Sequence, residues 1–202
     1  MGVKQLYTPV DNVWKGISQI DGLAPLLLRL YLAPVMIQAG WNKIQGFDGV
    51  VEWFGNSEWG LGLPFPLLLA SLAIAAEFIG GILLIPGILV RWVSIPLMVT
   101  MLVAAFSVHW PNGWLAIADP NSWLASEQVA ESAQKLAIAK EILQEHGNYE
   151  WLSSSGSFVV LNNGIEFAIT YFVMLLSLFF TGGGRYTSVD YWVHRSVMKS
   201  QN

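Results

Sequence analysis

The chain has 202 residues, of which 54% are hydrophobic and only 12% are charged. This composition suits a lipid solvent better than water and argues against an ordinary soluble domain. The absence of cysteine excludes disulfides, thiolate nucleophiles and iron–sulfur ligands from the chain, so redox chemistry would need a borrowed cofactor. The net charge of −4 is too small to indicate a charged partner, and we expect no nucleic-acid partner.

Four apolar segments approach the roughly 20 residues that a helix needs to cross a bilayer. They run over residues 24–41, 64–85, 90–108 and 165–180. We therefore predict an all-α polytopic membrane protein, with one domain over 1–202 built as a four-transmembrane-helix bundle. A cleavable signal peptide is the alternative for the first segment, but the segment contains Arg29, so we expect it to be retained.

The second and third segments are joined by Ile85-Pro86-Gly87-Ile88-Leu89. Proline and glycine together stop one helix and redirect the chain, so this connection predicts a tight turn between antiparallel neighbours. Basic residues then set the orientation. The side of both termini and this turn holds Lys4, Lys15, Arg91, Arg185, Arg195 and Lys199, while the other side holds Lys43, Lys135 and Lys140. We predict a bacterial inner-membrane protein with both termini in the cytoplasm.

The remaining long connection, over 111–163, is predicted to lie on the periplasmic side. Within it, Ser126 is a suitable N-cap for a helix that stops near Gly147. Glu131 and Lys135 lie four residues apart on this helix and are expected to pair. We interpret it as an amphipathic helix over the outer mouth of the bundle, where a periplasmic protein partner would bind. A helix that rests on lipid headgroups is the alternative.

The most informative polar residue is Glu77, in the middle of the second span. A carboxylate at this depth costs free energy unless it is paired or protonated. With ~1.5 Å of rise per residue, Arg29 lies ~8 Å and Glu77 ~12 Å from the same end of the bundle, so the two are predicted to meet. The pair has two interpretations: an ion pair that only fixes helix register, or a proton carrier at Glu77 supported by Arg29.

A second polar group is expected at the outer end, where Gln38 and Lys43, His109 and Trp110, and Glu166 come from three different spans. Histidine and carboxylate at the rim of a lipid-accessible cavity suit a quinone, because both exchange protons as the ring is reduced or oxidised. The candidate catalytic residues are therefore Glu77, His109 and Glu166. The candidate cofactor-binding residues are Arg29, Gln38, Lys43, His109 and Trp110.

Two alternatives stay open for His109. Together with Glu166 it would ligate copper or zinc, but one histidine without cysteine is a weak ligand set, so we expect no metal. It would also serve as a simple interfacial side chain, since His109-Trp110-Pro111 marks the point where the helix ends and water begins.

Several short motifs follow one another in a characteristic order. They are the stretch from Arg29 to Gly40 with Lys43, Pro64-Phe65-Pro66, Ala76-Glu77-Phe78-Ile79-Gly80-Gly81, Gly87 with Arg91, and the closing Gly182-Gly183-Gly184-Arg185-Tyr186 with Ser188-Val189-Asp190. In this order they resemble the DoxX family of small bacterial four-helix membrane proteins. The resemblance covers nearly all of the chain outside 111–163.

The resemblance implies a redox-associated protein of the inner membrane, because the family includes the membrane subunit of thiosulfate:quinone oxidoreductase and components linked to oxidative-stress complexes. We therefore expect a quinone-linked subunit that works with a periplasmic donor or partner. Other members accompany machinery for modified copper-binding peptides, so a non-enzymatic scaffold or transport component is the alternative. A homo-oligomer also stays open.

Overall fold

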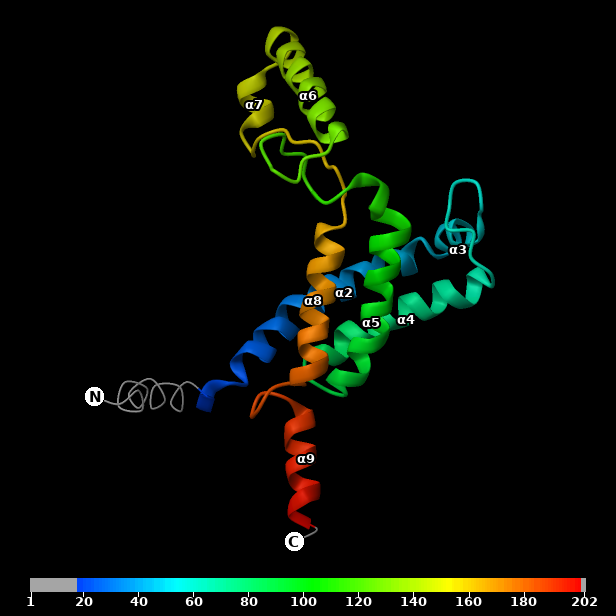
Figure 1. Cartoon of the computed structure of the whole chain (residues 1–202), viewed down its shortest axis with the longest axis vertical. Helices are drawn as coiled ribbons and strands as arrows, with labels where there is room; N and C mark the ends of the chain where they lie inside the picture. The colour runs from blue at the N-terminus through cyan, green and yellow to red at the C-terminus, as the bar shows by residue number, and fades with distance from the viewer. Residues whose placement is uncertain (1–17, 201–202) are drawn as a thin grey trace, which may run out of the picture. The chain divides into compact units, whose positions relative to one another are not determined.

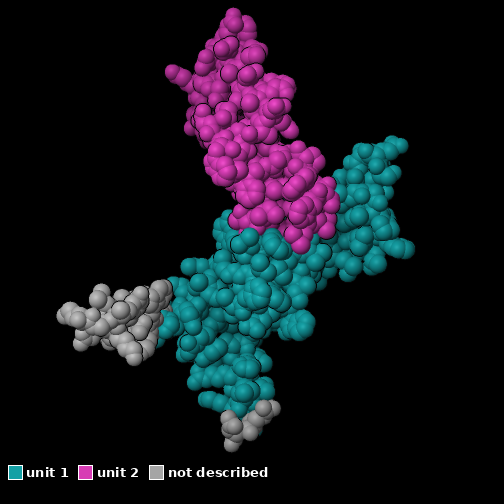
Figure 2. Space-filling view, viewed as in Figure 1, with its two compact units in different colours: residues 1–100, 171–202 teal, residues 101–170 magenta. Residues whose placement is uncertain are grey.

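The computed structural model describes residues 18–200. Over this range the chain forms helices joined by turns and loops, and its only β-type pairing is an isolated bridge between Ile117 and Leu161 (Figure 1). The predicted all-α class is confirmed. The chain divides into two compact units, Met1–Thr100 with Tyr171–Asn202 and Met101–Thr170 (Figure 2).

Three segments are long and apolar enough to cross a membrane. They are α2 (Leu23–Gln45), α4 (Pro66–Leu84) and the continuous segment Val90–Asn112, which begins with α5 (Val90–Val103). The fourth predicted span corresponds to α8 (Glu166–Thr181), which is apolar but has only 16 residues. Three of the predicted spans thus have the length and composition of membrane helices, and the four-span bundle stays a prediction.

The helices α2 and α4 approach each other closely because glycines lie at their contact. A Cβ atom placed on Gly40 would lie 2.7 Å from the backbone nitrogen of Phe78, and one on Gly81 would lie 2.9 Å from that of Ile37. Small residues of this kind let helix backbones approach in lipid, where tight packing replaces the hydrophobic effect as the driving force. The contacts run in opposite directions along the two helices, so α2 and α4 are antiparallel.

A short helix that was not predicted, α3 (Phe47–Gly55), contacts both α2 and α4. Its Phe54 is buried. Phe47, Val50, Val51 and Phe54 follow the spacing of one helix face, which is the signal that would have revealed it. The segment is too short to span a bilayer, so the length of apolar segments alone does not reveal it.

The predicted tight turn between the second and third spans is confirmed, and Gly87 is the residue that permits it. This glycine has a φ of +72°, in the left-handed region. A Cβ atom there would lie 2.6 Å from the Cβ of Ser188 and 2.7 Å from Nη1 of Arg29. Any side chain at position 87 would therefore be strained and would collide with two neighbours.

These neighbours belong to a hydrogen-bonded assembly that we call the Arg29 junction. The side chain of Arg29, in α2, is fully buried. Its Nη1 donates to the carbonyl oxygens of Leu84 and Ile85, each at 2.8 Å, and its Nη2 donates to that of Thr187 at 2.8 Å. The last carbonyls of a helix have no partner within the helix, so Arg29 satisfies the C-terminal end of α4.

The final helix, α9 (Val189–Ser200), closes the junction from the other side. The two carboxylate oxygens of Asp190 accept hydrogen bonds from the backbone N–H groups of Leu89, at 2.7 Å, and Val90, at 2.9 Å. These donors lie at the start of α5, where the helix dipole favours a negative charge. Asp190 thus caps α5, while Arg29 caps α4.

In the second unit, the helix predicted within the loop 111–163 is confirmed as α6 (Glu127–His146). The Oγ atom of Ser126 accepts from the backbone N–H of Val129 at 3.4 Å, as expected for an N-cap. Lys135 pairs with Glu131 at 2.7 Å, and its hydrogen bond and charge hold the pKa of that carboxyl below the ordinary value. A second short helix, α7 (Tyr149–Ser153), follows.

The orientation of the chain is not tested. Two of the basic residues on which it was predicted, Lys4 and Lys15, lie outside the described residues. The cytoplasmic position of both termini and the place of α6 over the outer mouth remain predictions.

We expect Arg29→Leu to lower the free energy of unfolding by about 3 kcal/mol, because it leaves three buried or partly buried carbonyl oxygens without their charged donor. Thermal unfolding of the detergent-solubilised protein, followed by circular dichroism, measures the change. Arg195→Leu removes the same charge from an exposed position on α9 and is the matched control. An Arg29→Leu protein as stable as this control would contradict the junction's role.

Candidate functional site

The buried carboxylate of α4 has a partner from α2. The side chain of Glu77 is 5% exposed, and its Oε2 accepts a hydrogen bond from Nζ of Lys43 at 2.5 Å. Lys43 belongs to the last turn of α2, and its side chain is 29% exposed. A lysine stem lies easily along apolar surface while its ammonium reaches a polar partner. The pair lowers the cost that either charge would carry alone among packed helices.

The predicted pair between Arg29 and Glu77 is therefore wrong. Arg29 donates to the carbonyls of Leu84 and Ile85, which lie at least seven residues beyond Glu77 along α4. At ~1.5 Å per residue the separation along the helix is ~10 Å, too far for one side chain to serve both places. Lys43 was assigned to a separate outer group because it lies at the end of its span. The lysine side chain is long enough to reach from the end of α2 to Glu77, and this length is the signal in the sequence that links the two residues.

An apolar cavity of about 450 Å³ lies between the end of α2, the start of α3 and one face of α4. It is lined by Ile44 and Phe47 and, from α4, by Ser71, Ile74, Ala75, Phe78 and Ile79. Ile44 and Phe78 are the chain neighbours of Lys43 and Glu77, but consecutive residues of a helix point in different directions, and neither charged side chain lines the cavity. Ser71 donates its hydroxyl hydrogen to the carbonyl of Leu67, which leaves the wall largely apolar. Cavities of this size hold small organic ligands in other proteins.

Gln38 does not join the ion pair. Its Nε2 donates to Oδ1 of Asn42, one turn further along α2, at 2.7 Å. Gln38 and Lys43 belong to the first unit, whereas His109 and Glu166 belong to the second. The predicted gathering of these four residues in one outer site stays a prediction.

His109 ends a π-helical turn, Ala104–His109, that continues α5. Such turns are rare and occur frequently at functional sites. Nδ1 of His109 lies 2.9 Å from the carbonyl oxygen of Asn163, which also accepts from Nδ2 of Asn112 at 3.1 Å. The neighbouring Trp110 is exposed and its ring packs against that of Phe106, with 5.4 Å between centroids.

Glu166, the first residue of α8, is held by the same loop segments. Its Oε2 accepts a hydrogen bond from the backbone N–H of Ala116 at 2.9 Å, and its own N–H donates to the carbonyl of Trp114 at 3.0 Å. His109 and Glu166 thus both bind backbone groups of the two paired segments around Ala116 and Asn163. These contacts give each residue a structural task and do not test a redox role.

Within residues 18–200, no three His, Cys, Asp or Glu side chains gather in a way that would hold a metal ion. Zinc sites of known proteins use three or four protein ligands. His109 and Glu166 would need further ligands to form the metal site considered as an alternative.

The chain is similar to proteins of one known family. The profile of the DoxX family matches residues 24–110. The putative oxidoreductase CatD of Bacillus subtilis is 31% identical over 86 residues, which cover 43% of this chain and 60% of that protein. An uncharacterized protein of Haemophilus influenzae is 31% identical over 108 residues, which cover 52% of this chain and 68% of that protein.

The inner membrane protein YphA of Escherichia coli is 33% identical over 66 residues, 33% of this chain and 44% of that protein. No solved structure matches the chain. The family match spans α2, α3, α4, the Lys43–Glu77 pair, the apolar cavity and the extended α5, so it covers the helices that build the candidate site. Together with its apolar helices, these matches show that the chain is a membrane protein that belongs to the DoxX family.

Proposed function

We propose that this protein is a quinone-linked, redox-associated subunit of the bacterial inner membrane, and that the quinone binds at α2 and α4, with its apolar body in the cavity between them and its ring at Lys43 and Glu77. The observation that carries the proposal is the ion pair at 2.5 Å, with its carboxylate 5% exposed. An apolar cavity between the same two helices, lined by Ile44 and Phe78, supports it. The name of CatD, a putative oxidoreductase, supports a redox role, and that of YphA supports the inner membrane.

The residues fit a ligand with an apolar body and polar ring oxygens. Ile74, Ala75 and Phe78 offer apolar surface to the body. The Lys43 ammonium supplies hydrogen-bond donors to a ring oxygen, and the Glu77 carboxylate accepts or returns a proton beside it. A quinone, when bound, takes up two electrons and two protons.

Three further parts of the proposal come from the family resemblance and the sequence. The electron donor is a periplasmic protein or partner that contacts the loop 111–163. His109, Trp110 and Glu166 are retained as candidate contacts to the ring on the outer side. Arg29 is not retained, since three carbonyl oxygens occupy its terminal nitrogens.

The alternative is a non-enzymatic scaffold or transport component in metal or modified-peptide handling. The same ion pair supports it, because a buried pair that only fixes helix register needs no ligand. Under this alternative, well-packed apolar residues in place of both Lys43 and Glu77 preserve function. Under the quinone proposal they preserve the fold and abolish function.

We expect Glu77→Gln and Lys43→Met each to weaken quinone binding about tenfold, a factor that corresponds to the loss of one charge-assisted hydrogen bond. Equilibrium binding of short-chain benzoquinone and naphthoquinone analogues to the detergent-solubilised protein measures this effect. Glu131→Gln is the matched control, since it breaks the exposed ion pair of α6. The paired variant Lys43→Met with Glu77→Leu should unfold near the wild-type temperature and bind neither analogue.

Two outcomes would remove the proposal. One is wild-type protein that carries no quinone from its native membrane and binds neither analogue. The other is an apolar paired variant that supports growth or electron transfer as well as the wild type does, which would favour the scaffold.

The apolar cavity provides an independent test. We expect Ala75→Phe to prevent binding of either analogue with little change in the unfolding temperature, because the new ring fills space that the ligand needs while the ion pair stays intact. Leu72→Phe places the same ring at an exposed position of α4 outside the cavity and is the control. Equal binding by the two variants would show that this cavity is not the site.

A further inference from the structure

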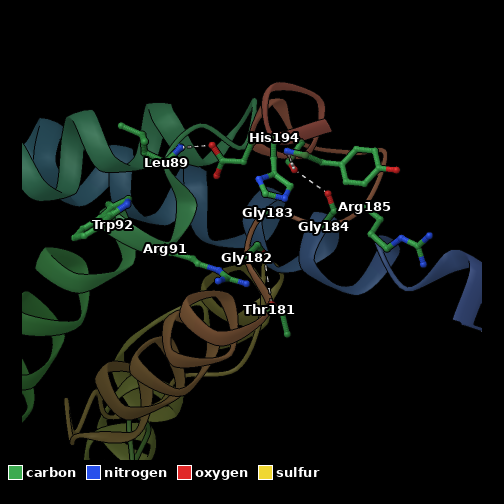
Figure 3. Close-up of a pocket in the computed structure, with 12 residues that line it drawn as sticks. Leu89, Arg91, Trp92, Thr181, Gly182, Gly183, Gly184, Arg185 and His194 are labelled. Carbon is green, nitrogen blue, oxygen red and sulfur yellow. Dashed lines mark hydrogen bonds between the residues drawn. The ribbon is translucent and has the colours of Figure 1, made fainter. Parts of the chain in front are cut away.

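A second cavity, of about 390 Å³, lies at the Arg29 junction, between the start of α5, the glycine segment 182–184 and α9. It belongs wholly to the first unit and shares no lining residue with the apolar cavity between α2 and α4. Its walls carry Arg91 and His194, which Figure 3 shows on two sides of the glycine segment.

Arg91 supplies positive charge without a matching carboxylate. Its Nη2 donates to the carbonyl of Phe180 at 3.2 Å, and the remaining guanidinium N–H groups are available to a ligand. None of the ion pairs found among residues 18–200 includes Arg91. A guanidinium with several available donors is the group that recognises phosphate oxygens best.

The other charged groups at this cavity are already engaged. Both oxygens of Asp190 accept backbone N–H groups at the start of α5. Arg185 pairs with Asp21 at 3.3 Å, and in Figure 3 its side chain points away from Arg91. Asp190 keeps its negative charge, and the buried Arg29 interacts with that charge and offsets it. Among the charged residues that line the cavity, Arg91 is therefore the one whose charge no other group offsets within residues 18–200.

The glycine segment keeps the space beside Arg91 open. A Cβ atom on Gly182 would lie 3.2 Å from Nε of Arg91, and one on Gly183 would lie 2.6 Å from the Cβ of Ser188. Side chains at these positions would crowd the guanidinium and the cavity floor.

The position along the chain indicates which anion is available. Arg91 and Trp92 lie in the first turn of α5, a candidate membrane span, and the side chain of Trp92 is 72% exposed. Tryptophan beside a basic residue at the end of a span is typical of the headgroup level of a bilayer. Basic pockets between helices at this level bind anionic headgroups.

We propose that this cavity binds the phosphate group of an anionic phospholipid, with Arg91 as the principal ligand and His194 as a second hydrogen-bonding group. The site is independent of the proposed quinone chemistry, because it contains neither Lys43 nor Glu77 and shares no residue with the apolar cavity between α2 and α4. A bound lipid would contact α5, α9 and the glycine segment at once and would stabilise their junction.

The test compares the full-length protein in nanodiscs of phosphatidylcholine with and without phosphatidylglycerol. Native mass spectrometry is expected to show one retained phosphatidylglycerol on the wild type. Arg91→Gln should lower its occupancy about fivefold, the factor for ~1 kcal/mol from one basic side chain at an anionic surface. His194→Gln should lower it less. Lys199→Gln removes the same charge as Arg91→Gln, but from a residue of α9 outside the cavity, and should leave occupancy unchanged.

Equal losses in Arg91→Gln and Lys199→Gln would mean general attraction to the surface and would overturn the proposal. The lipid assignment would be overturned if millimolar inorganic phosphate displaced the lipid and the protein retained phosphatidylglycerol no better than phosphatidylcholine. Thermal unfolding in phosphatidylcholine alone identifies a misfolded variant. If Arg91→Gln misfolds, Arg91→Lys replaces it. This variant keeps the positive charge and should lose part of the lipid occupancy. Unchanged lipid occupancy in both Arg91→Lys and His194→Gln would refute the site. Quinone binding by the Arg91 variants should equal that of the wild type.

Discussion

A charge among packed apolar helices must find its partners within the protein, and this constraint explains the position of Arg29. Its guanidinium donates to carbonyl groups at the end of α4 and to Thr187 in the segment before α9. Segments from three distant parts of the chain are thereby fixed around one buried side chain. Gly87 leaves the room that the guanidinium needs, and Asp190 completes the turn by capping α5.

The same constraint has a different outcome at Glu77. Its partner, Lys43, is a side chain that can itself move and exchange a proton, whereas the partners of Arg29 are backbone carbonyls. A pair of a titratable base and an acid, with the acid 5% exposed, has a capacity for proton exchange that the Arg29 junction lacks. The structure thus gives Arg29 and Glu77, which depth along the helices had paired, different partners: backbone carbonyls for Arg29 and the side chain of Lys43 for Glu77.

The sequence was sufficient for features that depend on local pattern. Apolar length located α2, α4 and the segment that begins with α5, because the thickness of a bilayer sets the length of a span. Ser126 and Gly147 located α6, since capping chemistry is local. The short helix α3 was not predicted, because its nine residues are too few to cross a bilayer and apolar length reveals only membrane spans. The motifs around Glu77 and Gly87 were enough to indicate the DoxX family, which the comparisons show.

What the sequence could not provide was the pairing of side chains from different helices. Depth along each helix made Arg29 and Glu77 look like partners, but the partner of a buried charge also depends on the register of α2 against α4 and on where helix ends leave carbonyls unsatisfied. Gly40 and Gly81 set that register through contacts between residues far apart in the chain. The sequence by itself therefore determined that this is a helical membrane protein with charges that need partners. Only the tertiary structure decided that Lys43 pairs with Glu77 and that Arg29 closes the helix ends, because those choices depend on close packing between segments that the sequence keeps apart.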